Sequence, residues 1–218
     1  YYQVVIAAGN DRSDTGLAQV ANKGGYDLLS GTGTSKNGIT VAAVEEVESY
    51  IDPSSVVMSS FSNFGPTDDG RIKPDISAKG VSVSSCTSIG NSTYGLLSGT
   101  SMATPAITGM ILLLQKHYNN ITSNYMKAAT VRGLICHTAK EAGLSNGPDY
   151  EFGWGLANTE GAAQLISAKG VSAVLDENNL VNGQVFTSNI SISSTQKITA
   201  TICWTDPTGA GNIVGDED

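Results

Sequence analysis

The sequence has little positive charge, few histidines and no long apolar run. Its 218 residues contain 12 Lys and Arg against 20 Asp and Glu, which gives a formal net charge of −8. This balance argues against a nucleic-acid partner, because no basic surface is present to meet phosphates. No apolar run approaches the ~20 residues that a membrane-spanning helix needs, so no membrane partner is predicted either. The apolar fraction of 40% is typical of a globular protein.

The sequence also lacks the patterns of a disulfide framework or a metal site. Cys86, Cys136 and Cys203 are widely spaced and form no C-x-x-C pair. We therefore expect buried free thiols and no zinc. The acidic residues have no spacing typical of a calcium loop, so no cofactor is predicted, and solvated loop side chains are favoured. These acids are Asp11, Asp14, Asp68, Asp69 and the terminal Asp216, Glu217 and Asp218.

The most informative segment is Gly99-Thr-Ser-Met-Ala-Thr-Pro105, which is followed directly by an apolar stretch. Residues 107–114 are apolar on nearly all sides, which predicts a helix inside the protein. Pro105 is expected in the first turn of this helix, where a missing N–H costs little. Ser101 would then lie at the positive end of the helix dipole, where developing negative charge is favoured. From its position alone, Ser101 could be either a nucleophile or a helix N-cap.

A second segment, Val4-Val-Ile-Ala-Ala-Gly-Asn10, indicates a buried strand of a parallel sheet. Active sites gather at the carboxyl ends of such strands, and Asn10 lies just past this end. Its amide and the backbone N–H of Ser101 would provide two donors for a carbonyl oxygen that becomes an oxyanion. The alternative is an ordinary asparagine in a turn.

These two segments, in this order and about ninety residues apart, resemble the subtilisin-like serine peptidases, the subtilases. The resemblance covers residues 1–168 and implies the C-terminal part of an α/β, three-layer catalytic domain with a parallel sheet. Further stretches similar to this family are 36–44, 60–66, 71–80 and 152–158.

The sequence departs from the family pattern at two positions. Ala106 stands where many members have a histidine that is outside the catalytic triad, so catalysis is not affected. Lys79 stands where proline is usual, and we expect only a small change in a loop.

The resemblance implies a role for each matching residue. Ser101 would be the nucleophile and Asn10 the side-chain donor of the oxyanion hole. Substrate would bind along Ala7, Ala8 and Gly9, which form one wall of the pocket for the residue before the scissile bond, and along Gly99 and Thr100. The family also implies a peptide or protein substrate and a secreted or cell-envelope location. Structural calcium, which many subtilases bind, cannot be assigned to residues of this sequence.

The chain has no candidate for the catalytic base. His117 lies sixteen residues after Ser101 on one predicted helix, about 24 Å away at 1.5 Å per residue. His137 lies in the last turn of the next predicted helix, where it can interact with the carbonyl end. The family order is Asp, His, Ser, so both missing triad members are expected upstream of Tyr1. We therefore expect an upstream half as partner and an inactive isolated chain.

The sequence pattern changes near residue 170. Before it, strands alternate with helices, including helices predicted over 123–138 and 158–168. After it, residues 185–192 and 197–204 alternate with period two, which predicts antiparallel strands. Residues 198–207 resemble the opening of the C-terminal β-sandwich of some subtilases. We therefore expect residues 169–218 to begin a jelly-roll-like sandwich that too few strands are present to close.

The sequence leads to three hypotheses about function. The first is a serine endopeptidase, and the second is a pseudopeptidase or binding module that keeps the scaffold without the triad. The third is a stable fragment of an active enzyme. The sequence upstream of Tyr1 would separate them.

Overall fold

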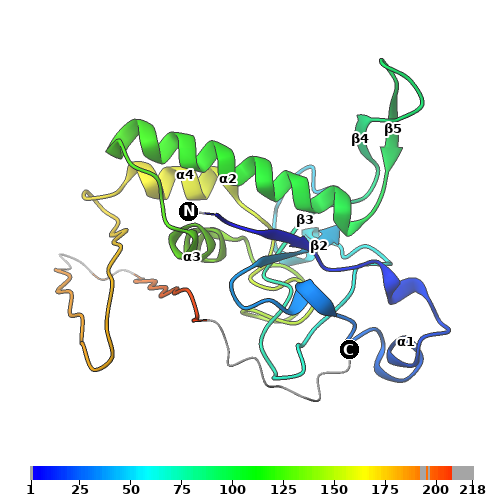
Figure 1. Cartoon of the computed structure of the whole chain (residues 1–218), viewed down its shortest axis with the longest axis horizontal. Coiled ribbons are helices and arrows are strands. Elements are labelled where there is room, and N and C mark those ends of the chain that lie inside the picture. Colours follow the sequence, from blue (N-terminus) through cyan, green and yellow to red (C-terminus); the bar gives the residue numbers. More distant parts are fainter. Residues whose placement is uncertain (1, 192–194, 196, 208–218) are drawn as a thin grey trace.

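The computed structural model describes residues 2–191, 195 and 197–207, and its centre is a parallel sheet (Figure 1). Strands β1 (Val5–Ala7), β2 (Ile39–Val44) and β3 (Ile76–Lys79) lie in the order β1-β2-β3, and both pairings are parallel. The parallel α/β architecture that the sequence predicts is therefore confirmed.

The central strand β2 is buried along its whole length. Its residue Thr40 is paired with Ile6 of β1, and Ala42 is paired with Ser77 of β3. A nearly continuous apolar run is typical of a parallel strand that other elements cover on both faces.

Three helices form one apolar core with the sheet. They are α2 (Thr100–Thr122), α3 (Ala128–Thr138) and α4 (Thr159–Ser167). In Figure 1 the long helix α2 runs across the molecule with α4 beside it. Buried members of this core include Val41, Ile76, Ile107, Leu114, Ile135 and Ile166.

Helix α2 is buried on one face only, so the expectation that it lies wholly inside the protein is wrong for this chain. Ile107, Met110 and Leu114 face the core, whereas Leu112 and Leu113 are each 67% exposed. The buried positions recur at three- and four-residue spacing and form one stripe, and the two exposed leucines lie on the opposite side.

The start of α2 also differs from the expectation. Gly99 is the N-cap and the helix begins at Thr100, so Pro105 lies inside the helix rather than in its first turn. A proline at this position has no N–H to donate to the carbonyl of Ser101, four residues earlier.

The other two helices agree with their predicted positions except at one end. Helix α3 begins at Ala128 rather than near 123, because α2 continues to Thr122 and Ser123 ends it in the left-handed conformation (φ 58°). Helix α4 lies within the predicted range 158–168, and the side chain of Asn158 caps it by accepting a hydrogen bond from Gly161 N at 3.0 Å.

Several smaller elements complete the described structure. Strands β4 (Val83–Cys86) and β5 (Tyr94–Leu97) form an antiparallel hairpin that extends away from the core at one end of α2 (Figure 1). Helix α1 spans Ala18–Lys23. Short 3-10 helices lie at Asp11–Ser13, Gly31–Thr34 and Pro53–Ser55.

Two expectations about single side chains are corrected. Lys79 ends strand β3 instead of lying in a loop, and its Nζ forms an ion pair with Glu46 at 2.6 Å. Cys86 is free but exposed, because its hairpin projects from the core. Cys136 and Cys203 are free and partly buried, and burial raises the pKa of the Cys136 thiol.

The C-terminal segment does not form the predicted strands in this structure. No strand is present in the described residues of 185–191 or 197–204. An antiparallel strand needs a neighbouring strand for its ladder, and the described residues of the segment offer none. Residue 192 and the acids at 216–218 lie outside the described residues, and the division into domains 1–168 and 169–218 stays a prediction.

Candidate active site

Ser101 is the second residue of helix α2 and faces solvent. The cap position belongs to Gly99, whose φ of 156° carries the chain into the helix, so the N-cap interpretation of Ser101 is wrong. No group in the described part of the chain hydrogen bonds the Ser101 hydroxyl. The hydroxyl and the backbone N–H therefore both lie in the first turn, where the helix dipole favours negative charge.

Asn10 lies at the same helix end. It follows strand β1 by three residues, and its Oδ1 accepts hydrogen bonds from Thr100 N at 2.8 Å and from Thr100 Oγ1 at 3.0 Å. Asn10 is exposed, and within residues 2–191, 195 and 197–207 its Nδ2 has no hydrogen-bond partner. An unpaired amide donor next to the first turn of α2 can donate a hydrogen bond to an oxygen that carries negative charge there.

Gly80 sets how closely the start of α2 approaches the sheet. Gly80 N donates to Val44 O at 3.0 Å, and Gly80 O accepts from Gly99 N at 2.8 Å. A Cβ at Gly80 would lie 2.5 Å from the Ala43 Cβ and 2.8 Å from Gly99 O. Only glycine fits here, and Gly80 thus holds the chain before Ser101 directly against the ends of β2 and β3.

The predicted substrate-binding residues differ in their access to solvent. Ala7 and Gly9 are partly exposed and can line a binding surface, while Ala8 and Gly99 are buried. Thr100 is completely buried, and its hydroxyl accepts from Gly9 N at 3.1 Å while it donates to Asn10. The Thr100 hydroxyl thus bonds Gly9 and Asn10 within the protein, and the role of Thr100 in substrate binding stays a prediction.

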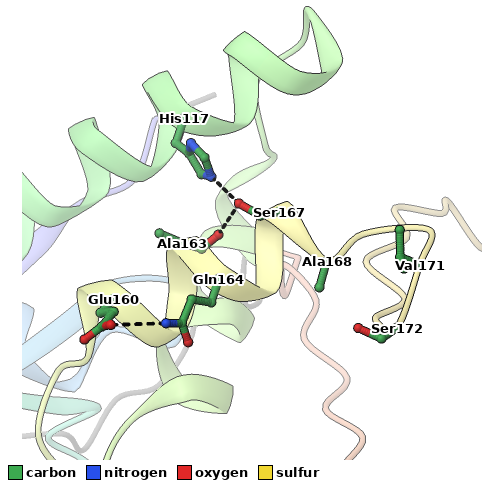
Figure 2. Close-up of a pocket in the computed structure, with 8 residues that line it drawn as sticks. All are labelled: His117, Glu160, Ala163, Gln164, Ser167, Ala168, Val171 and Ser172. Carbon is green, nitrogen blue, oxygen red and sulfur yellow. Dashed lines mark hydrogen bonds between the residues drawn. The ribbon is translucent and has the colours of Figure 1, made fainter.

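Both histidines hydrogen bond groups other than Ser101. His117 lies on the same unbroken helix sixteen residues further on, about 24 Å away, and its Nε2 lies 2.8 Å from Ser167 Oγ (Figure 2). His137 lies in the last turn of α3, with its Nδ1 2.8 Å from Thr201 Oγ1. In the described residues, neither ring hydrogen bonds a carboxylate, so neither has the orienting partner of a catalytic histidine.

A shallow groove of about 540 Å³ lies at the far end of α2, between this helix, α4 and the loop after it (Figure 2). His117, Ser167 and Val171 are among its lining residues. It is remote from Ser101 along α2, so it is not the place where a peptide would meet the nucleophile.

The described residues contain no group of three or more His, Cys, Asp or Glu side chains placed to hold a metal ion. Three of the acids considered at the sequence level have partners within the protein. Asp11 accepts from Asn63 Nδ2, Asp14 accepts from Gly16 N, and Asp69 accepts from Arg71 Nε. Nor does any helix within the described residues have the length and apolarity to cross a membrane.

Sequence reasoning missed the residues that hold the site together. Gly80 and Asn63 lie in stretches that resemble the family, but the sequence around them predicts no role for either residue. Their contacts join segments far apart in the sequence, and no local periodicity reports such contacts.

The sequence is similar to several known proteins. The sequence model described as the subtilase family matches residues 2–155. C5a peptidase of Streptococcus pyogenes is 45% identical over 84 residues, which are 38% of this chain and 7% of that protein. Subtilisin-like protease SBT3.16 of Arabidopsis thaliana is 28% identical over 160 residues, 66% of this chain and 20% of that protein. Its relative SBT3.13 is 33% identical over 130 residues, 51% of this chain and 16% of that protein.

The matched part of this chain thus spans a fifth or less of the length of each of these relatives. The family match, in contrast, covers well over half of the chain, from before β1 to beyond Ser101. The chain belongs to the subtilase family.

Proposed function

We propose that this chain supplies the nucleophile and the oxyanion hole of a serine endopeptidase. The observation that carries the proposal is the orientation of Asn10. Its side-chain oxygen is held by Thr100, so its amide donor is left without a partner in the described residues, next to the first turn of α2 that carries Ser101. The family match and the relatives named as peptidase and protease support the same activity.

The chemistry is acyl transfer. Ser101 Oγ attacks the carbonyl carbon of a peptide bond and gives its proton to a histidine on an upstream part of the protein. The carbonyl oxygen becomes an oxyanion, which accepts hydrogen bonds from the Asn10 amide and the Ser101 N–H. The same histidine returns the proton to the departing amine, and an acyl-enzyme on Ser101 remains. Water then hydrolyses this ester and regenerates the hydroxyl.

The substrate is a peptide or protein chain. Ala7 and Gly9 carry little or no side chain, which leaves room beside the residue that precedes the scissile bond. The opposite wall of this pocket is expected on the upstream part, so the residue preference is not defined by these positions. A secreted or cell-envelope location is part of the proposal and rests on the family.

The test is Ser101→Ala in the complete protein. Peptide hydrolysis should fall below about 1% of the wild-type turnover while substrate binding, measured by isothermal titration with an uncleavable peptide, is retained. The matched control is Ser167→Ala, which removes the hydroxyl beside His117 and should leave turnover unchanged. Substantial hydrolysis by the Ser101→Ala variant would contradict the proposal. A wild-type protein that binds peptides without cleaving them would identify a pseudopeptidase.

A further inference from the structure

Asn63 is a buried asparagine that hydrogen bonds the residues on both sides of Asn10. Its side chain and backbone are 2% exposed to solvent. Its backbone N–H donates to Gly9 O at 3.0 Å, and its Oδ1 accepts from Asp11 N at 2.6 Å. Its Nδ2 donates to the Asp11 carboxylate at 2.9 Å. The chain is therefore held at the residue before Asn10 and at the residue after it.

The Asn63 amide can adopt only one orientation. Both Nδ2 protons are used, because a second bond goes to Leu28 O at 3.1 Å. Turning the amide over would place its nitrogen against the Asp11 N–H and its oxygen against a carboxylate and a carbonyl. A buried polar group whose bonds are all made specifies one arrangement of its surroundings.

Gly9 packs directly on this amide. A Cβ at Gly9 would lie 2.3 Å from Asn63 Nδ2, and its φ of 107° is a conformation that other residues rarely adopt. The turn from Gly9 to Asp11 is thus shaped around the Asn63 side chain.

The position of Asn10 depends on the hydrogen bonds that Asn63 makes to Gly9 and Asp11. It belongs to neither a strand nor a helix, its backbone lies at φ −126° and ψ 21°, and it is exposed. Thr100 fixes the side-chain oxygen, but the position of the Asn10 Cα follows from the two neighbours that Asn63 holds. A misplacement of about 1 Å in a catalytic group can cost about a hundredfold in rate.

We propose that Asn63 is a positioning residue of the oxyanion hole, which acts by holding Gly9 and Asp11 on either side of Asn10. The proposal rests on the proposed function, in which Asn10 stabilises the oxyanion. Asn63 does not touch substrate, so its effect belongs to the transition state and not to substrate binding.

The first experiment is Asn63→Asp in the complete protein. This change keeps the shape and the acceptor for Asp11 N, but it turns a donor into an oxygen that faces the Asp11 carboxylate and Leu28 O. We expect kcat to fall by about tenfold to a hundredfold with little change in KM. Combining it with Asp11→Asn, which supplies an amide donor from the other side, should recover part of kcat. A change in KM alone, or a fully retained kcat, would overturn the proposal.

A double-mutant cycle with Asn10→Ala tests whether Asn63 acts through Asn10. In the Asn10→Ala background, Asn63→Asp should cause no further loss of kcat. If the same fold-loss persists there, Asn63 does not position the oxyanion hole. If Asn10→Ala alone leaves kcat unchanged, the proposed function itself fails, so the two failures are distinguishable.

Two further variants separate positioning from stability. Ser77→Ala removes a buried hydrogen bond to Gly155 O (2.9 Å) away from the turn, and it should lower the unfolding free energy while kcat is kept. Asp11→Ala changes an exposed side chain and removes one acceptor of Asn63. It should lower kcat by a smaller factor than Asn63→Asp does. Its kcat still tests the proposal if the Asn63→Asp variant does not fold. The proposal would be overturned if Asp11→Ala left kcat unchanged and Ser77→Ala lowered kcat as much as Asn63→Asp does.

Discussion

The side-chain oxygen of Asn10 accepts two hydrogen bonds from one residue, Thr100. The backbone nitrogen lies 2.8 Å away and the hydroxyl oxygen 3.0 Å away. A backbone N–H can only donate, so the atom of Asn10 that faces it must be the oxygen and the amide nitrogen must face outward. The residue just before the proposed nucleophile therefore sets the direction of the proposed oxyanion donor.

Thr100→Val is expected to lower kcat of the complete protein by about three- to tenfold, with KM nearly unchanged. Valine keeps the shape but removes a hydroxyl that bonds both Asn10 and Gly9, and one net hydrogen bond contributes about 0.5–1.5 kcal/mol. Thr100→Ser keeps the hydroxyl and should retain most of kcat. Steady-state kinetics on a peptide substrate checks both, and equal losses in the two variants would argue against this role.

If Asn10 is the proposed oxyanion donor, Asn10→Ala is expected to lower kcat by about 10² to 10³ with little effect on KM, the magnitude measured for an oxyanion-hole asparagine of a subtilisin. The amide donates to charge that develops only in the transition state. Asn120→Ala, which changes an exposed asparagine on α2, is the matched control and should have no effect. A change confined to KM would make Asn10 a ground-state contact.

The isolated 218-residue chain is expected not to react with a fluorophosphonate probe. The Ser101 hydroxyl must lose its proton during attack, and His117 on the same helix is about 24 Å away. Addition of the upstream part of the protein should restore labelling at Ser101, detected by mass spectrometry of the labelled peptide. Strong labelling of the isolated monomer would show that the base lies within this chain.

The exposed apolar surface should make the isolated chain self-associate. Leu112 and Leu113 face outward, and strand β1 pairs only with β2 in the described structure, which leaves its other edge open. Replacing both leucines with glutamate should reduce light scattering of the isolated chain. Leu114→Glu is the control, because Leu114 is buried and this change should unfold the chain. Equal scattering with and without the paired substitution would mean that this face is not the cause.

The buried ion pair between Lys73 and Asp75 should be sensitive to removal of one partner. Lys73 Nζ also donates to Gly38 O at 2.9 Å, and Asp75 Oδ2 accepts from Thr40 N at 2.6 Å. Burial lowers the pKa of Lys73 and raises that of Asp75, while their pairing opposes both shifts. Asp75→Asn should destabilise the fold by about 3–5 kcal/mol, because it leaves a buried ammonium unpaired. Lys73→Met combined with Asp75→Asn should cost less than Asp75→Asn alone.

The pH dependence of the Asp75→Asn variant follows from the same pair. Without the carboxylate, the pKa of Lys73 falls further below its ordinary value, so the unfolded chain binds more protons than the folded chain. The unfolding free energy of the variant should therefore rise with pH, from the folded pKa of Lys73 up to its unfolded value. Urea unfolding at several pH values measures this slope, and a slope equal to that of the wild type would contradict it.

Parts of the fold that depend on local pattern could be predicted from the sequence. The apolar run before Asn10 predicts β1, and the helix predicted over 158–168 contains α4. The β4–β5 hairpin was not predicted, because its strands are largely exposed and carry no clear alternation. The prediction that Pro105 lies in the first turn is wrong because the helix begins after the cap at Gly99. That cap depends on a hydrogen bond to Gly80, nineteen residues earlier.

The sequence predicts which chemical groups belong to the candidate site, but not the contacts that orient them. Ser101 and Asn10 were named from motifs that the family shares, whereas the contacts that orient Asn10 come from Thr100 and Asn63. Those contacts depend on how segments some fifty and ninety residues apart meet in the folded chain. The segment after residue 180 shows the same limit, since its alternating pattern forms strands only if partner strands are present.

The separation of Asn10 and Ser101 along the chain also has a consequence during protein synthesis. Asn10 lies three residues after the end of β1 and Ser101 lies at the start of α2, so the ribosome makes the proposed donor about ninety residues before the proposed nucleophile. A nascent chain that ends at the β4–β5 hairpin has Asn10 but neither Ser101 nor the Thr100 bonds that orient it. Under the proposed function, the oxyanion hole can therefore be complete only after α2 has been made and has docked on β2.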